Sequence, residues 1–178
     1  MTSRPILYLD YDGVLHPADV RVTRDASQQP QVYIRGRPSS HPLFEHTQLL
    51  ESLLEPFPAL RIILATSWVK EFGFEYALEQ LTPSLKARVV GSTWRQGMGF
   101  EPPARYYCIQ IDAEERRIER WLALDDDLYC WPDNELHRVV APTDRILGLA
   151  EPGIAEQLKT SSQHFALKQH LWTLRCER

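Results

Sequence analysis

Acidic and hydroxyl side chains close three apolar segments of the chain, and their types suit the binding of a metal ion and a phosphate. The apolar segments 5–10, 61–66 and 118–124 end at Asp10 and Asp12, at Thr66 and Ser67, and at Asp125-Asp126-Asp127. Neighbouring carboxylates repel each other, and burial raises the free energy of each charge, so folding alone does not favour this pattern. A divalent cation reverses the balance, because Mg²⁺ prefers oxygen ligands and is held by one or two carboxylates with phosphate and water.

Each of these groups, taken singly, also has an ordinary structural explanation. Asp12-Gly13 is a common turn dipeptide, and Thr66-Ser67 could cap the helix that follows it. Three consecutive aspartates are typical of a solvated loop. All three explanations would have to coincide at the strand ends of one sheet, so the combination favours a metal-assisted phosphoryl-transfer site.

The elements that must position these residues alternate along the chain. Strands are expected at residues 5–10, 61–66, 87–90, 118–124 and 137–140, and helices at 43–55, 68–80, 105–115 and within 148–158. This alternation indicates βαβ units, so the sequence predicts an α/β fold with a central parallel sheet of about five strands. Ligands of such sheets bind beyond the carboxyl ends of the strands, where the candidate residues are expected.

The segment of residues 14–42 is irregular and rich in proline. Within it, the alternation from Gln31 to Arg35 predicts a short hairpin strand. Basic residues interleave with Tyr33 in this segment, namely Arg21, Arg24, Arg35 and Arg37. They could hold a nucleic-acid phosphate, although a solvated hairpin explains the same residues. We expect one domain, residues 1–178, with 14–42 as a short hairpin insertion.

Three stretches resemble motifs of the haloacid dehalogenase (HAD) superfamily. LDYDGVL resembles the first motif, DxDGxL; ILATSW resembles the second, a hydrophobic strand ending in Thr or Ser; and WLALDDD resembles the fourth, acidic motif. The resemblance implies a three-layer Rossmann-like fold. Members of the superfamily often cover the site with a cap, but the segment after the first motif and residues 91–104 are short here. We therefore expect a nearly capless member, whose open site suits a large or extended substrate.

The resemblance implies a role for each matched residue. Asp10 would be the nucleophile that forms an aspartyl-phosphate, and Asp12 would be the general acid for the leaving oxygen and then the base for the hydrolytic water. Gly13 would let the chain turn sharply away from the site. Thr66 would hydrogen-bond the transferring phosphoryl oxygens, with help from Ser67 or its backbone amide.

Mg²⁺ is the cofactor that the resemblance implies. Its ligands would be Asp10, the backbone carbonyl of Asp12, and an acid of the fourth motif. Within that motif Asp126 is the first choice, Asp125 the second and Asp127 the third.

The third motif of the superfamily is a Lys or Arg that balances charge near the nucleophile. Arg105 begins the helix that precedes the 118–124 strand, which is the expected place, and arginine can grip an oxyanion at two points. A plain surface charge is the alternative for Arg105. Arg116 and Arg117 are rivals, although both are expected at the far end of that helix.

Two aromatic residues beside the motifs have two interpretations each. Trp68 could stack on a base of the substrate, or it could complete the core. His16 could contact substrate, or it could belong to the turn before Pro17.

Composition and charge restrict the partners and the compartment. The 178 residues include 43% hydrophobic and 25% charged ones, and the net charge of −4 argues against a basic nucleic-acid grip over the whole surface. We expect no signal peptide, because the N-terminus lacks a charged region followed by a long apolar one. We expect no membrane partner, because no apolar run approaches the roughly 20 residues of a membrane span. Three scattered cysteines, Cys108, Cys130 and Cys176, indicate reduced thiols in a cytoplasmic protein.

The leading hypothesis is a Mg²⁺-dependent phosphomonoester hydrolase acting on a phosphorylated small molecule or a nucleic-acid end. A narrower alternative is a nucleic-acid end-processing phosphatase or a nucleotidase, and a non-enzymatic alternative is a metal-bound interaction module. The covalent intermediate could pass its phosphoryl group to water or to another acceptor, so a phosphotransferase stays open. The open site could also be closed by a homo-oligomer.

Overall fold

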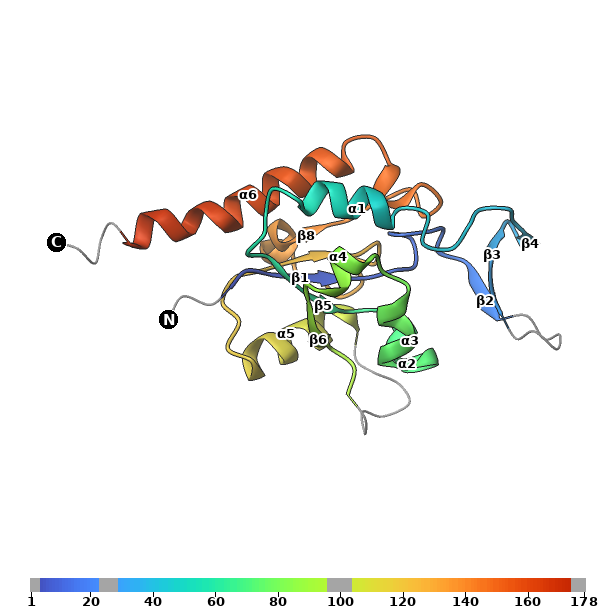
Figure 1. The fold of residues 1–178 in the computed structure, drawn as a ribbon, viewed down its shortest axis with the longest axis horizontal. Coiled ribbons are helices and arrows are strands. Elements are labelled where there is room, and N and C mark those ends of the chain that lie inside the picture. Colours follow the sequence, from blue (N-terminus) through green and yellow to red (C-terminus); the bar gives the residue numbers. More distant parts are fainter. Residues whose placement is uncertain (1–3, 23–28, 96–103, 174–178) are drawn as a thin grey trace.

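The computed structural model describes residues 4–22, 29–95 and 104–173, and a parallel five-stranded sheet lies at its centre (Figure 1). The strands, in spatial order, are β6 (Val89–Ser92), β5 (Arg61–Leu64), β1 (Ile6–Leu9), β7 (Trp121–Leu124) and β8 (Val139–Val140). In the central strand, Leu9 lies opposite both Leu64 and Leu124. The residues that follow β1, β5 and β7 therefore meet at one edge of the sheet.

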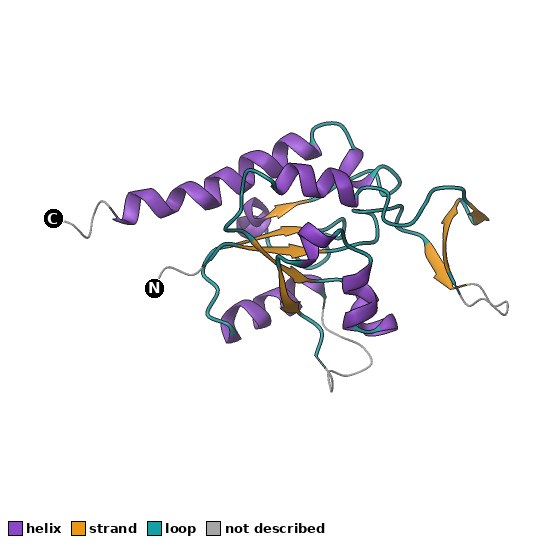
Figure 2. Cartoon of the chain, in the orientation of Figure 1, coloured by secondary structure: helices purple, strands orange, loops and turns teal. Residues whose placement is uncertain are grey.

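Helices cover both faces of this sheet and give the three-layer α/β fold that the sequence predicted (Figure 2). On one face, helices α1 (Thr47–Leu54) and α6 (Ile154–Thr173) pack on Leu7 and Leu9. On the other face, α5 (Arg105–Glu115) packs on Tyr8. Successive residues of a strand point to opposite faces, so one short apolar strand supplies both cores.

Two of the predicted helices have different bounds in the structure. The helix predicted for 68–80 is broken into α2 (Ser67–Phe72) and α3 (Phe74–Glu79), because Gly73 adopts φ 93° between them. A further short helix, α4 (Pro83–Lys86), was not predicted. The helix predicted from residue 43 begins only at Thr47, since Phe44 adopts φ 59° and cannot be helical.

The C-terminal third also departs from the prediction in detail. The strand predicted for 137–140 is only β8, because a 3₁₀ helix, η1 (Asp133–Arg138), occupies the residues before it. The predicted loop before the last helix contains a second 3₁₀ turn, η2 (Gly148–Ala150). Helix α6 extends well beyond the predicted limit, yet neither it nor any other described helix has the length and apolarity of a transmembrane segment.

The predicted hairpin after the first motif is a separate three-stranded antiparallel sheet at one end of the molecule (Figure 1). Its strands are β2 (Val20–Val22), β3 (Pro30–Ile34) and β4 (Arg37–Pro38). Arg35 and Gly36 form the two-residue turn between β3 and β4, with φ 50° and 75°. The loop predicted at 91–104 lies mostly outside the described residues.

Candidate active site

Three carboxylates converge at the carboxyl edge of the sheet. One oxygen from each of Asp10, Asp125 and Asp126 lies within 4.8 Å of the others. Asp10 follows β1, the other two follow the adjacent β7, and the parallel register brings the two strand ends together. The side chains are buried, with Asp10 3% and Asp125 1% exposed. Buried like charges at this spacing require compensating cations.

Asp10 is held by donors at both of its oxygens. Its Oδ1 accepts a hydrogen bond of 2.8 Å from the backbone N–H of Tyr11, and its Oδ2 accepts one of 3.1 Å from Nη2 of Arg105. Burial raises the pKa of Asp10 well above its ordinary value, with Asp125 and Asp12 adding to the rise and Arg105 opposing it. A further positive charge beside Asp10 would lower this pKa and favour the ionised carboxylate.

Arg105 is the first residue of α5 and reaches into the acidic cluster. Besides its bond to Asp10, its Nε lies 3.2 Å from Oδ2 of Asp125, and its Nη1 donates to the backbone carbonyl of Ala65. A cation at a helix N-terminus opposes the helix dipole, so these acceptors must offset that cost. The planar guanidinium thus bridges the ends of β1, β5 and β7.

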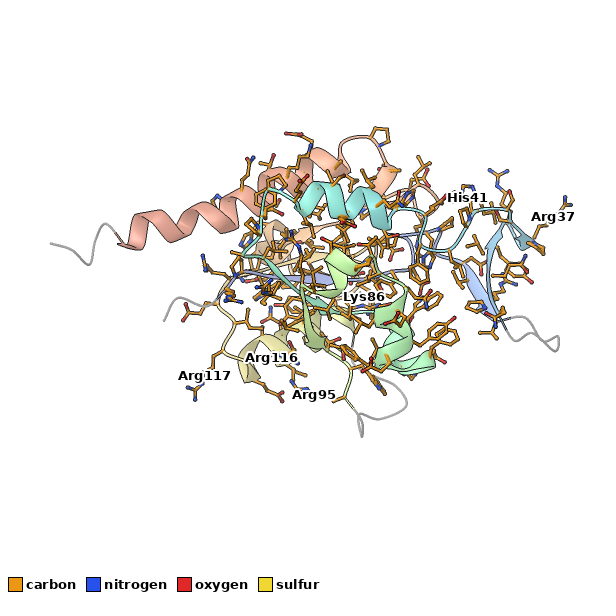
Figure 3. The ribbon with its side chains drawn as sticks, viewed as in Figure 1. Arg37, His41, Lys86, Arg95, Arg116 and Arg117 are labelled. Atoms are coloured by element: carbon orange, nitrogen blue, oxygen red, sulfur yellow. The ribbon has the colours of Figure 1, made fainter. Side chains whose placement is uncertain are left out.

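The rival arginines lie elsewhere. Figure 3 shows Arg116 and Arg117 together, on the side of the molecule opposite the hairpin that carries Arg37. Nε of Arg116 donates a hydrogen bond of 2.7 Å to the buried Asp112, which also accepts one from the hydroxyl of Tyr8. Arg116 therefore belongs to a structural network beneath α5, and of the three candidates Arg105 is the one beside the nucleophile position.

Asp125 leaves one buried oxygen without a hydrogen bond. Its Oδ1 accepts a bond of 3.0 Å from the backbone N–H of Asp127, but Oδ2 has no hydrogen-bond partner among the described residues, although Arg105 lies close to it. Burial, partly offset by Arg105, raises the pKa of Asp125 to about 6. A buried carboxylate oxygen without a hydrogen bond, on a residue that lies beside two more carboxylates, fits a hard divalent cation such as Mg²⁺.

Asp126 is paired with Arg145, which follows β8 and which the sequence analysis did not single out. Nε of Arg145 lies 2.5 Å from Oδ2 of Asp126, whose side chain is only 3% exposed. Burial raises the pKa of Asp126, and Arg145 opposes the rise. Gly13, with φ 69°, is needed here as well as in the turn, because a Cβ at that position would overlap the Asp126 carboxylate.

Asp127, the third choice for a metal ligand, is not part of the cluster. Its Oδ1 accepts a hydrogen bond of 2.9 Å from the backbone N–H of Tyr129, and its side chain is exposed. The structure therefore places it in the turn that follows the acidic motif.

Asp12 is held by a separate set of donors. Its Oδ1 accepts hydrogen bonds of 3.0 Å from Nε2 of His16 and from Nε1 of Trp68, and its Oδ2 accepts one of 3.2 Å from the hydroxyl of Ser67. The side chain of Asp12 is 26% exposed, and it does not belong to the three-carboxylate cluster. Its carboxylate is thus oriented independently of Asp10, as a separate proton carrier requires.

The tautomer of His16 follows from its surroundings. The ring is fully buried, and its Nδ1 accepts a hydrogen bond of 3.3 Å from the backbone N–H of Phe44. A neutral imidazole that accepts at Nδ1 carries its proton on Nε2, so His16 donates to Asp12. The expectation that His16 contacts substrate is therefore wrong, because the ring is buried beneath Asp12. His16 closes the turn before Pro17, as the alternative held, and it holds Asp12 from there.

The placement of Trp68 also corrects the prediction that it contacts substrate. The indole is 2% exposed and packs edge-on against the rings of Tyr11, His16 and Phe44. It completes the core, as the alternative interpretation held, and its polar edge reaches Asp12. A buried indole cannot stack on a substrate base, but it can fix a carboxylate.

Thr66 and Ser67 follow β5, whose end lies beside the end of β1 that carries Asp10. A phosphoryl group bound at Asp10 would therefore be near both residues. The Oγ1 of Thr66 accepts a hydrogen bond of 3.4 Å from the backbone N–H of Trp68, which makes Thr66 the cap of α2. Its hydroxyl proton remains for a second partner. Capping and phosphate binding are thus compatible, and the phosphate-binding role stays a prediction.

The sequence analysis did not identify Arg145 or the role of His16. A signal in the sequence existed for the first and not for the second. Arg145 follows a short strand that was predicted, at the same sheet edge as the aspartates, so its position was detectable. His16 carried no such signal, because its contact with Asp12 depends on the turn between them and on the packing of the His16 ring against Phe44.

The sequence is also similar to that of a known protein family. The family model described as the HAD domain in Swiss Army Knife RNA repair proteins matches residues 6–154. That range contains each of the motifs and Arg145. No curated protein and no solved structure gives a significant match.

Proposed function

Because the chain belongs to the family of HAD domains found in Swiss Army Knife RNA repair proteins, we propose that it is a Mg²⁺-dependent phosphomonoester hydrolase that acts on nucleic-acid ends. The observation that carries the proposal is the convergence of Asp10, Asp125 and Asp126, with the guanidinium of Arg105 in contact with the first two. Three buried carboxylates are poorly explained by folding, and a phosphate with a divalent cation explains all of them.

Asp10 acts as the nucleophile in this mechanism. One of its carboxylate oxygens forms a bond to phosphorus while the bond to the leaving oxygen breaks, and an aspartyl-phosphate results. Arg105 orients the carboxylate and reduces its repulsion of the incoming phosphate. Water then attacks the same phosphorus, which frees Asp10 and releases inorganic phosphate.

Asp12 carries the proton, and its contacts select the atom that does so. Oδ1 already accepts two N–H groups, from His16 and Trp68. Among the described residues, Oδ2 has a hydrogen bond with the hydroxyl of Ser67 alone, which can donate or accept. We assign the proton to Oδ2, which gives it to the leaving oxygen and afterwards takes one from the attacking water.

The metal ion would be held by Asp10, Asp125 and Asp126, together with the backbone carbonyl of Asp12. When bound, it supplies charge that keeps Asp10 ionised and screens the approaching phosphate. The unpartnered Oδ2 of Asp125 and the raised pKa of all three carboxylates support this assignment.

The family description and the shape of the insertion support a nucleic-acid end as substrate. The segment after the first motif is a small hairpin, so the described residues contain no folded cap over the carboxylates. A terminal phosphate on a long strand can enter such a site.

We also propose a cytoplasmic location, which the reduced thiols of Cys108 and Cys130 support.

The decisive experiment follows phosphate release from p-nitrophenyl phosphate and from short RNAs phosphorylated at the 3′ or the 5′ end, with Mg²⁺ and with EDTA. We expect Asp10→Asn to lower kcat about 10⁴-fold or more, as loss of a nucleophile does. Asp127→Asn is the matched control, because Asp127 lies outside the cluster, and its kcat should stay within about twofold of wild type.

Asp12→Asn tests the covalent step. p-Nitrophenolate leaves without a proton, so Asp10 can still be phosphorylated, whereas its hydrolysis loses the base. We expect the aspartyl-phosphate to accumulate, as measured by intact mass after acid quench. Mg²⁺-dependent stabilisation without turnover on any of these substrates would instead support an interaction module, and phosphoryl transfer to an added alcohol in preference to water would support a phosphotransferase.

A further inference from the structure

A recess of about 260 Å³ opens between the hairpin and the loop that follows β8. Its walls come from the turn after the first motif, from the end of β3, and from the loop of Arg145. Backbone hydrogen bonds join these walls, from Ala18 N–H to the carbonyl of Arg145 at 2.9 Å and from Tyr33 N–H to the carbonyl of Asp19 at 2.7 Å. The recess is therefore a built feature that joins the insertion to the core.

Arg145 connects the recess to the acidic cluster. This residue lines the recess, and its guanidinium contacts Asp126. The recess is therefore one side chain away from the position where a phosphate at Asp10 would be bound.

The lining combines apolar and basic residues. Pro17, Ile34 and Ile146 supply apolar surface, and Arg35 and Arg145 supply positive charge. The lining acid, Asp19, is neutralised by Arg21 through two hydrogen bonds of 2.8 and 2.7 Å. Arg145 is paired with Asp126, so Arg35 is the lining residue whose charge is offered to an anion. Apolar contact for a flat group and a positive charge for an anion together suit a nucleotide.

The position of Arg35 is unfavourable for the turn that it occupies. Arg35 and Gly36 both have positive φ, and a two-residue hairpin turn of this kind favours Asn-Gly or Gly-Gly. The chain places a long cation there instead, in the lining of the recess. A residue held in a sparsely populated conformation beside a cavity suggests a functional contact.

We infer that this recess is the subsite for the strand that carries the scissile phosphate: it holds the nucleoside next to the reacting phosphate, and Arg35 contacts the following phosphodiester. The inference rests on the proposed function and adds to it the location of the strand. Its volume suits one nucleoside, since pockets for larger ligands start at roughly 300 Å³. A free nucleotide has no phosphodiester for Arg35 to contact, so this contact distinguishes an oligonucleotide from a free nucleotide.

The test compares Arg35→Asn with Arg37→Gln. Asparagine suits a positive φ, so the hairpin keeps its turn while the charge is lost. Arg37 is equally part of the hairpin, but it does not line the recess, and Figure 3 shows it projecting away from the core. Each variant therefore removes one positive charge from the same small sheet, but only Arg35→Asn changes the lining of the recess.

The substrates are a short single-stranded RNA with a terminal phosphate, the matching mononucleotide and p-nitrophenyl phosphate. For Arg35→Asn we expect kcat/KM on the RNA to fall about five- to tenfold further than on p-nitrophenyl phosphate. Binding of fluorescein-labelled RNA to Asp10→Asn/Arg35→Asn should lose about one unit of the salt slope relative to Asp10→Asn alone. Arg37→Gln should change neither quantity.

The outcomes separate this inference from the proposed function. Absence of turnover by the wild type on every substrate defeats the proposed function itself. Turnover with equal RNA defects in Arg35→Asn and Arg37→Gln leaves the hydrolase standing and overturns the subsite. The subsite is also overturned if the mononucleotide is hydrolysed as efficiently as the RNA and Arg35→Asn affects both alike, which would indicate a nucleotidase.

Discussion

The carboxyl edge of the sheet and the inserted hairpin are neighbours that are built in opposite ways. At the sheet edge, Asp10 and Asp125 are buried, and each is fixed by backbone N–H groups and by Arg105. In the hairpin, β2 and β4 have three and two residues, and the arginines at the turn are exposed. Reactive geometry thus depends on the core, while the contacts that could select a substrate depend on a small peripheral sheet.

This difference predicts two classes of substitution. Changes at the sheet edge should alter the rate on every substrate, because they act on the reacting atoms. Changes in the hairpin should alter only the ratio between substrates, as the contrast of Arg35 with Arg37 tests. Variants at the boundary between the two regions are the most informative.

Replacement of His16 by Leu should impair the sheet edge without removing any contact with substrate. Oδ1 of Asp12 loses one of its two N–H donors, so Asp12 is less well oriented as an acid. We expect kcat to fall about 100-fold on an alkyl phosphomonoester and about tenfold on p-nitrophenyl phosphate, since a poor leaving group depends more on the acid. Steady-state kinetics on both substrates measures the two losses.

His16→Gln is the matched control, because its amide N–H can reach toward Asp12. Partial recovery on the alkyl substrate would identify His16 as a positioning residue. Losses of equal size on both substrates, with no recovery in His16→Gln, would mean that the imidazole only fills the core. Thermal unfolding should accompany the kinetics, since His16→Leu also leaves the backbone N–H of Phe44 without its acceptor.

The strand ends were predictable from the sequence, because apolar runs and the acids that close them are local signals. The parallel register, with Leu9 opposite Leu64 and Leu124, then follows from the βαβ alternation, and α5 has the bounds that were predicted. The broken helix at Gly73 was harder to predict. A glycine lowers helix propensity everywhere, but only its tertiary setting decides whether the helix continues.

The side-chain contacts of the site were less predictable than its backbone. Asp10, Asp125 and Asp126 were chosen by motif, and the register of two adjacent strands brings them together. His16 and Trp68 contact Asp12 through burial under Phe44, which no local pattern encodes. The recess depends on the packing of a hairpin against a loop more than a hundred residues later in the chain, and a single sequence carries no signal for that contact.

In the metal-free protein, the change of stability with pH is expected to depend on the buried carboxylates of the sheet edge and not on the hairpin. Burial raises the pKa of Asp125 to about 6, above its unfolded value, so the folded state holds this proton more tightly. The free energy of unfolding that this proton contributes is therefore fully present below the pKa of the unfolded state. It is lost as the pH rises through about 6. Between about pH 5 and about pH 8 the loss is about 1 kcal/mol, or about 2–4 °C in Tm.

Scanning calorimetry in EDTA at the two pH values measures this change, with Asp125→Asn as the control. The variant should show a smaller drop, since it cannot ionise. Mg²⁺ should raise Tm more at the higher pH, where its ligands are already deprotonated. A wild-type Tm that rises from pH 5 to pH 8 by the same amount as that of Asp125→Asn would contradict the tighter binding of the proton by Asp125 in the folded state.

Arg145 connects the two regions, and its replacement should have a small and specific effect. Its guanidinium neutralises Asp126 in the metal-free protein, and a cation bound by Asp126 must compete with it. The Arg145 side chain is 66% exposed, so the pair contributes only about 0.2–1 kcal/mol. Arg145→Gln should therefore tighten Mg²⁺ binding by about two- to fivefold at about pH 8.

Calorimetric titration of Mg²⁺ into the nucleotide-free protein measures this affinity, and Arg35→Asn is the control. Arg35 lines the same recess but belongs to the hairpin, so its loss should leave the Mg²⁺ affinity unchanged. If both variants tightened Mg²⁺ binding equally, the effect would come from net charge and not from the contact with Asp126. A selective effect of Arg145 would mean that metal binding at the sheet edge releases a cation toward the recess, which couples the two regions through one side chain.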